Sequence, residues 1–223
     1  MIAALALAAG LAAGVPEQAK PYLPILRQEV NSLWPTAQVA VLAAQVDHET
    51  ACPIPTKCWN PRVEFNTSRE RGAGFGQITQ VFGRFDALGE MKARHKELYG
   101  WNWETTLYDP RYQLRALVLK NRDNYAQLSF ATDVRERTAM MLVAYNAGLG
   151  GVFKDRALCR NTGGCDASRW YGGIETACTA SKVPQKGYGL SFCDIRKRYP
   201  MDIQQNRAIR YEDWAKKIPG DAH

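Results

Sequence analysis

Residues 36–50, TAQVAVLAAQVDHET, form the stretch on which the predicted fold depends. Apolar side chains recur there at intervals of three and four, the spacing that places residues on one face of an α-helix. The residues on this face are Val39, Leu42, Val46 and Glu49. Thr36 is a favoured N-cap residue and follows Pro35, so we predict a helix that begins after Thr36 and ends near Glu49.

Glu49 is the exceptional residue of this helix, because its carboxyl group shares a face with apolar side chains. A partly buried carboxylate at the negative end of a helix is disfavoured in its charged form. We therefore expect its pKa to be raised, which suits a group that protonates a glycosidic oxygen near neutral pH. A surface glutamate at a frayed helix end is the alternative on this helix alone.

The sequence that follows, ACPIPTKCWNP, together with the acidic residues and the histidine before it, has the composition of a metal site. Asp47, His48 and Glu49 are consecutive, so a helix directs their side chains about 100° apart and they cannot chelate one ion together. Five residues separate Cys52 from Cys58, whereas zinc-binding cysteines are usually separated by about two to four. We predict a small disulfide-closed loop here, and neither a metal nor a cofactor.

The chain contains six cysteines, an even number that is typical of disulfides formed in an oxidising compartment. They fall into three groups that are each local in sequence, which favours pairing within each group. The predicted disulfides are Cys52–Cys58, Cys159–Cys165 and Cys178–Cys193.

Helical spacing dominates the rest of the chain, and no segment alternates with the period of two that indicates a strand. The predicted helices are a polar surface helix over 84–98, one that starts at Pro110 behind an Asp109 cap, one from Thr132 or Asp133 to Gly148, and a last one over about 201–216. The prediction is therefore a mainly α, single domain over residues 16–223, in which disulfides hold a C-terminal part made of helices and loops.

Two further stretches contain candidate binding residues. TSRERGAGFGQIT, residues 67–79, alternates glycines that let the backbone approach a ligand closely. Gln77 after them is suited to present its amide to a sugar, although a plain flexible loop is the alternative. AYNAG, residues 144–148, ends an apolar helix; Tyr145 and Asn146 are either site residues or, respectively, a core aromatic and part of the helix cap.

Three sequence features occur in a fixed order along the chain. A glutamate ends a predicted helix, GAxGxxQIT follows some twenty residues later, and AYNAG follows after some seventy more. This order resembles the lytic transglycosylase superfamily, whose fold is like that of goose-type lysozyme, over about residues 36–150. The segments CWNP and CDASRWYGGIE resemble a phage-encoded branch of the same family and extend the likeness over most of the chain.

The resemblance implies roles for individual residues. Glu49 matches the family's catalytic acid and base, and a lysozyme-like fold is expected around it. The residues expected to contact substrate are Thr50, Ser68, Gln77, Ile78, Tyr145 and Asn146. Thr50 stands where the family commonly has serine and keeps the hydroxyl, whereas Ser68 lies one position upstream of the family's serine.

The substrate implied by the resemblance is peptidoglycan, cleaved at the β-1,4 bond between N-acetylmuramic acid and N-acetylglucosamine. A transglycosylase needs only one carboxyl group, because the muramyl 6-hydroxyl is the nucleophile and a 1,6-anhydro product forms, unlike the usual two-carboxylate arrangement. A hydrolytic muramidase needs a second carboxylate, for which Glu70 is the best candidate with Glu64 behind it; both are otherwise solvated charges or partners of arginines. A non-catalytic wall-binding virion protein is the further alternative.

The net charge of +7 favours anionic polymers such as those of the cell wall. No nucleic-acid motif occurs, so we predict no nucleic-acid partner. A monomer is the default expectation, and the resemblance implies action in the bacterial periplasm or cell wall. Residues 1–15, MIAALALAAGLAAGV, are apolar but shorter than the ~20 residues of a membrane span. They are a signal-peptide core, a weak membrane anchor or a buried helix.

Overall fold

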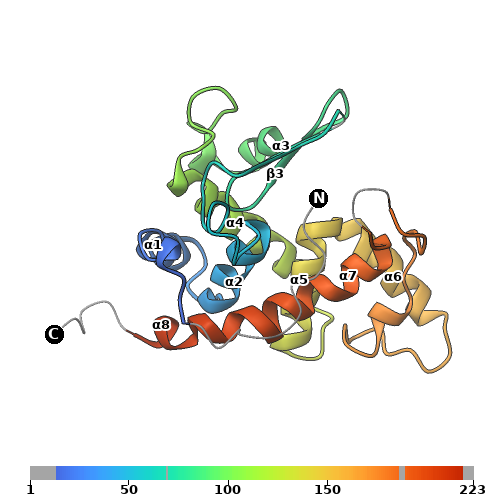
Figure 1. Cartoon of the computed structure of the whole chain (residues 1–223). Coiled ribbons are helices and arrows are strands. Elements are labelled where there is room, and N and C mark those ends of the chain that lie inside the picture. The colour runs from blue at the N-terminus through green and yellow to red at the C-terminus, as the bar shows by residue number, and fades with distance from the viewer. Residues whose placement is uncertain (1–13, 69, 186–188, 218–223) are drawn as a thin grey trace. The chain divides into compact units, whose positions relative to one another are not determined.

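The computed structural model describes residues 14–68, 70–185 and 189–217 (Figure 1). The chain divides into two compact units. The first unit comprises the described residues up to Lys120 together with those from Gln205 onward, and the second comprises Asn121–Gln204. The prediction for the apolar segment 1–15 falls almost entirely outside the described residues, and the predicted domain boundaries stay a prediction.

Helix α2 (Val39–Glu49) is the central helix of the first unit. It packs against α1 (Leu23–Leu33), the 3-10 helix η5 (Ala208–Tyr211) and α8 (Glu212–Lys216). Every residue from Val41 to Asp47 is buried, so the helix is covered on all sides rather than on one face. The predicted start was wrong: the amide of Ala37 donates to the carbonyl of Trp34, which places Thr36 in a turn before the helix.

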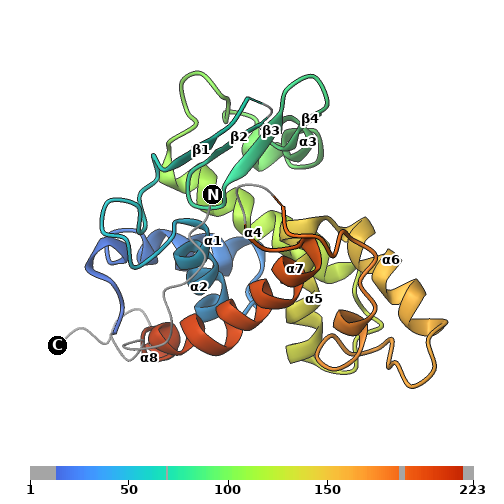
Figure 2. The same cartoon turned by 45° about the vertical axis from the view of Figure 1, so that its right-hand side comes forward.

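The first unit also contains a four-stranded antiparallel sheet in the order β1–β2–β3–β4 (Figure 2). Its strands are β1 (Glu64–Asn66), β2 (Glu70–Ala73), β3 (Ile78–Val81) and β4 (Phe85–Asp86). The glycine-rich stretch is thus a hairpin, in which Ala73 pairs with Ile78 across the turn. Strands of two to four residues are too short to show a period of two, which is why no strand was indicated by the sequence.

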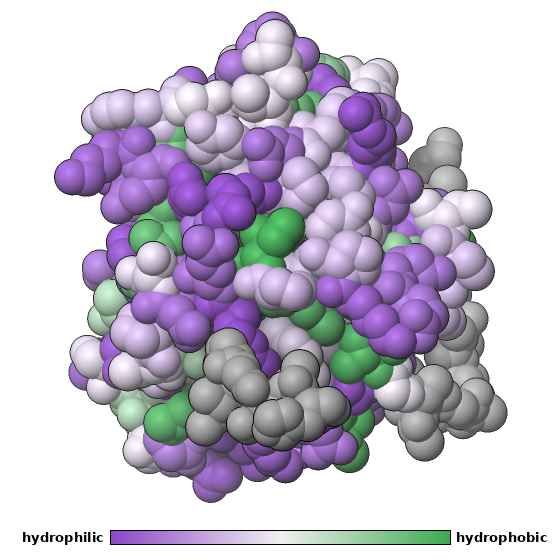
Figure 3. Space-filling view, turned by 90° about the vertical axis from the view of Figure 1, so that its left-hand side faces the viewer, coloured by the Kyte–Doolittle hydropathy of each residue, from purple (hydrophilic) through white to green (hydrophobic). Residues whose placement is uncertain are grey.

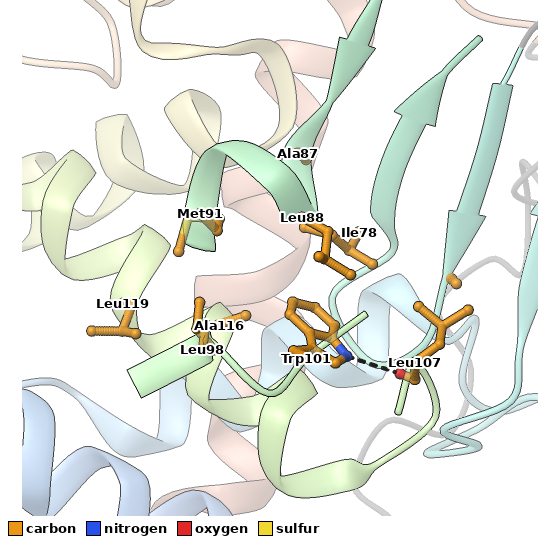
Figure 4. Packing of buried hydrophobic residues seen from close by; sticks show 10 residues of the cluster. Ile78, Ala87, Leu88, Met91, Leu98, Trp101, Leu107, Ala116 and Leu119 are labelled. Carbon is orange, nitrogen blue, oxygen red and sulfur yellow. Dashed lines mark hydrogen bonds between the residues drawn. The ribbon is translucent and has the colours of Figure 1, made fainter. Parts of the chain in front are cut away.

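A compact core lies between this sheet and two helices, α3 (Ala87–Arg94) and α4 (Pro110–Ala126) (Figure 4). Its buried residues are Ala73, Ile78, Ala87, Leu88, Met91, Leu98, Trp101, Leu107, Ala116 and Leu119. The helix predicted over 84–98 is shorter than expected, because it begins after an Asp86 cap and ends at Arg94. It buries one face, and a 3-10 helix η2 (Lys96–Leu98) follows it. The predicted Asp109 cap of α4 is confirmed by its hydrogen bond from the amide of Arg111 (2.8 Å).

The second unit is built around α5 (Val134–Ala147), which packs against α6 (Leu149–Arg160) and α7 (Phe192–Met201). The predicted limits of α5 are confirmed: the Asp133 carboxylate accepts a hydrogen bond from the Glu136 amide (2.9 Å), and Gly148 ends the helix at a φ of 80°. A 3-10 helix η3 (Ile174–Thr176) lies against α6. The predicted last helix is a run of different helical types: the π-helical segment η4 (Asp202–Arg207), then η5 and α8.

All three predicted disulfides are present: Cys52–Cys58 in the first unit, and Cys159–Cys165 and Cys178–Cys193 in the second. The fold is mainly helical with one small antiparallel sheet, as the sequence predicted for its class. Three disulfides are typical of proteins that fold in an oxidising compartment outside the cytoplasm.

Hydrophilic residues cover most of the face shown in Figure 3, and apolar residues appear there only in small separate areas. Within the described ranges, none of the helices combines the length and the apolar character that a membrane span requires.

Candidate active site

Glu49 is the last residue of α2, and only 8% of it is exposed. Its neighbour Thr50 is fully buried, donates a hydrogen bond to the carbonyl of Val46 (2.7 Å) and accepts one from the amide of Trp59 (3.0 Å). The Thr50 hydroxyl is thus engaged within the protein. It fastens the Cys52–Cys58 loop to the end of the helix that carries Glu49.

Asp47 of α2 also holds the Cys52–Cys58 loop in place. Its carboxylate accepts hydrogen bonds from Trp59 Nε1 (2.7 Å) and the Tyr211 hydroxyl (2.5 Å), and it forms an ion pair with Arg210 (2.8 Å). Burial raises the pKa of Asp47, although the Tyr211 hydrogen bond and the Arg210 charge act in the opposite direction. The network joins α2, the loop and η5, so it holds the last turn of α2 in place.

The contacts of Asp47 also bear on whether Asp47, Cys52 and Cys58 could bind a metal ion. Ligand atoms of Asp47, Cys52 and Cys58 lie within 4.8 Å of one another, as a metal site requires. Both sulfurs, however, belong to a disulfide and offer no thiolate, and the aspartate already has three partners. The cluster is therefore a structural one.

The glycine-rich turn, Gly74–Gln77, is held by a residue that sequence reasoning missed. Gln113 of α4 is buried; its Oε1 accepts from the Phe75 amide (2.8 Å), and its Nε2 donates to the carbonyls of Pro61 and Leu107 (both 2.9 Å). Gly74 has a φ of +73°, and a Cβ there would lie 2.4 Å from the Gln113 side chain. Close approach to Gln113 and the left-handed backbone both require glycine.

The predicted residues around this turn have different surroundings. Gln77 Nε2 donates to the carbonyl of Gly74 (2.9 Å), so part of its amide closes the turn while the side chain stays partly exposed. Ile78 is buried in the core beneath the sheet, and Ser68 is exposed between β1 and β2. Of these three, Gln77 and Ser68 are accessible to a ligand, and Ile78 supports the hairpin from inside.

Helix α4 connects the turn with Glu49. Gln113 and Lys120 are seven residues apart, which places them on the same face of a helix about 10 Å from each other. Burial lowers the pKa of Lys120 to about 8, and the negative charge of Glu49 opposes this shift, so the two groups interact electrostatically. Both views place α2 beside α4 (Figures 1 and 2). The glycine turn thus contacts α4 through Gln113, and the helix that ends at Glu49 lies beside α4.

The two candidates for a second carboxylate differ. Glu64 forms an ion pair with Arg71 (2.6 Å) and accepts hydrogen bonds from the Tyr108 hydroxyl and from Asn66 (2.8 Å). Partial burial raises its pKa, but the hydrogen bonds from Tyr108 and Arg71 outweigh this effect and lower the pKa to about 2. Glu70 is half-buried on β2, and its amide donates to Thr67 Oγ1 (3.1 Å).

Tyr145 and Asn146 belong to the second unit, in the last turn of α5. Tyr145 is buried and Asn146 is exposed just before the helix ends. The buried tyrosine has the environment of a core aromatic, while the asparagine is accessible to a ligand.

No family model matches the sequence, and a search of curated proteins finds no match. The likeness to lytic transglycosylases accordingly rests on the motifs around Glu49, the glycine-rich turn and AYNAG.

Proposed function

We propose that the protein is a lytic transglycosylase that cleaves peptidoglycan between N-acetylmuramic acid and N-acetylglucosamine. The observation that carries the proposal is the position of Glu49. Glu49 is almost fully buried at the end of α2, a helix that lies beside α4, and α4 also fixes the glycine turn through Gln113. A shielded carboxyl at the end of a fixed helix is suited to donate a proton to a bound sugar.

In the proposed cycle the Glu49 carboxyl donates its proton to the glycosidic oxygen, and the bond from that oxygen to the muramyl C1 breaks. The resulting Glu49 carboxylate then removes the proton of the muramyl 6-hydroxyl. The 6-oxygen bonds to C1 and closes the 1,6-anhydro ring, and Glu49 is again protonated. One carboxyl group completes the cycle, because acid and base act in sequence.

The surroundings of Glu64 favour this one-carboxylate scheme over hydrolysis. A base that activates water works best with a pKa near the operating pH, whereas Glu64 has a pKa of about 2 and is already bound by Arg71 and Tyr108. Glu70 is the remaining candidate for a hydrolytic muramidase. The three disulfides agree with action in the periplasm or cell wall.

The test is a comparison of wild type, Glu49→Gln and Glu104→Gln on purified peptidoglycan and on Gram-negative cells with permeabilised outer membranes. Glu49→Gln keeps the side-chain size but has no proton to transfer, so we expect lysis to fall at least about a thousandfold with unchanged circular dichroism. Glu104 is exposed in the same unit, and its variant is the matched control with wild-type lysis.

Mass spectrometry of the products decides between the alternatives. We expect muropeptides that end in 1,6-anhydromuramic acid. Products with only reducing ends would instead establish a hydrolytic muramidase, and Glu70→Gln would then be the variant to test. A wild-type protein that binds peptidoglycan without cleaving it would establish the wall-binding protein and exclude the enzyme.

A further inference from the structure

Trp59 is a fully buried residue directly after Cys58, and it forms hydrogen bonds on both sides of Glu49. Its indole Nε1 donates to the Asp47 carboxylate (2.7 Å), two residues before Glu49. Its backbone amide donates to Thr50 Oγ1 (3.0 Å), the residue that directly follows Glu49. One residue from outside α2 therefore holds the last turn of the helix on either side of the proposed catalytic carboxyl.

The ring of Trp59 contacts the glycine turn. It packs against Phe75, which lies in the Gly74–Gln77 turn, with the two ring centroids 5.6 Å apart. Aromatic rings at this separation attract each other beyond the area that they bury. Phe75 is itself fully buried, and its amide is bound by Gln113 of α4. Trp59 is therefore a direct link between the glycine turn and the end of the helix that carries Glu49.

The backbone near these contacts has an unusual conformation at three positions. Within residues 14–68, 70–185 and 189–217, the residues other than glycine that have a positive φ are Ala51 (55°), Trp59 (49°) and Gln77 (45°). A side chain disfavours this left-handed region, so surrounding contacts must hold the backbone there. Ala51 follows the end of α2 and Gln77 closes the glycine turn, so the strain lies at Trp59 and in the two segments that it connects. Strain of this kind is common at active sites and ligand clamps.

We propose that Trp59 is a positioning residue that fixes Glu49 in relation to the glycine turn. The proposal rests on the function proposed above, in which Glu49 transfers the proton, and Gln77 of the turn is the residue that the resemblance places against the sugar. A displacement of about 1 Å between a catalytic group and its substrate lowers the rate by about a hundredfold. Two hydrogen bonds and one ring contact from Trp59 keep the carboxyl and the turn at a constant separation while the proton is donated and removed.

The experiment measures kcat and KM of Trp59→Phe on soluble, uncrosslinked peptidoglycan strands. The variant keeps an aromatic ring next to Phe75 but removes the indole N–H from which Asp47 accepts a hydrogen bond. We expect kcat to fall about tenfold to a hundredfold, because the end of α2 is no longer held in place. KM should stay within about twofold of the wild-type value, because Gln113 still binds the turn.

Trp170 of the second unit provides the matched control. It is as fully buried as Trp59, and its Nε1 has no hydrogen-bond partner among the residues that the structure describes. Trp170→Phe therefore shrinks a buried indole without removing a bond, and it should leave kcat and KM at wild-type values. If Trp59→Phe does not fold, benzothienylalanine at position 59 keeps the ring size and lacks only the N–H donor. A wild-type kcat in the folded position-59 variant, or an equal fall in Trp170→Phe, would overturn the proposal.

Amide hydrogen exchange tests the link through Trp59 without catalysis. Phe75→Leu alters a ring of the glycine turn alone, yet the hydrogen-bonded amides of residues 50–52 should exchange about tenfold faster in it, as in Trp59→Phe. Exchange within α5 of the second unit should not change. If wild type cleaves no peptidoglycan but these differences appear, the proposed function fails while the link stands. Unchanged exchange at residues 50–52 in Phe75→Leu contradicts the link itself.

Discussion

Glu49 and Glu64 are glutamates of the same unit whose surroundings give them different chemistry. Glu49 ends a helix that is buried on all sides, and only 8% of Glu49 itself is exposed. Glu64 lies on a short strand and has three hydrogen-bond donors, one of them a guanidinium. Donors of this kind hold a carboxylate in its charged form, and so Glu64 stabilises the sheet, whereas proton transfer is the role that we propose for Glu49.

This contrast predicts a pH-dependent contribution of Glu64 to stability. Its pKa is about 2 in the folded protein against an ordinary value of 4.5, so the folded state binds fewer protons than the unfolded state between these values. Its contribution is therefore complete above about pH 4.5 and is lost as the pH falls toward about 2.

Glu64→Gln tests this dependence by urea unfolding at a series of pH values. At neutral pH we expect the variant to be less stable by about 1 kcal/mol, the magnitude of a partly exposed charge-assisted hydrogen bond. Near pH 2 the two proteins should be equally stable. A stability difference that stays constant from pH 7 to pH 2 would show that the Glu64 pKa is not lowered by folding.

At the scale of elements, the turn between β2 and β3 is held in place by a residue of another element, Gln113 of α4. Gly74 and Gly83 both have φ near +70°, one in the β2–β3 turn and the other in the β3–β4 turn. A Cβ at Gly74 would collide with Gln113, whereas a Cβ at Gly83 would meet nothing within 4 Å. The two turns therefore form a matched pair for separating backbone strain from packing.

Alanine at either position should lower the free energy of unfolding by about 1–2 kcal/mol, because a side chain disfavours the left-handed region. Gly74→Ala should lower it by about a further 1–3 kcal/mol, because it also displaces Gln113 from the Phe75 amide. Chemical unfolding of the two variants measures the difference. Equal losses would mean that Gln113 does not fix the turn.

The helices were more predictable than the strands, because the signals that define a helix lie within its own sequence. The helices α4 and α5 contain their own signals, namely the caps Asp109 and Asp133 and a repeat of three and four residues. The strands are set by pairing, such as Ala73 with Ile78, and by a core that α3 and α4 complete. Segments as short and polar as these acquire strand geometry only from the elements that pair with them or pack against them.

At the scale of the whole molecule, net charge and disulfides are the properties that bear on the proposed action at the cell wall. The chain carries a net charge of +7, and each unit contains at least one disulfide. A positively charged protein is attracted to anionic wall polymers through water, and salt weakens that attraction.

We therefore expect the inactive Glu49→Gln protein to bind peptidoglycan sacculi in a salt-dependent manner. Between about 50 and 300 mM NaCl the bound fraction at fixed protein concentration should fall several-fold, because the Debye length shortens. Cosedimentation with sacculi measures this fraction, and the fluorescence of the tryptophans at each salt concentration verifies that the protein stays folded. Binding that is independent of salt would mean that uncharged contacts dominate.

The sequence by itself determined the helical class, the start of α4, both ends of α5 and the three disulfides, because each depends on residues close together in the chain. Only the tertiary structure decided that Gln113 fixes the glycine turn and that Tyr108 and Arg71 bind the Glu64 carboxylate. These contacts join residues from separate elements, and the charge of a carboxyl depends on whichever groups surround it in space.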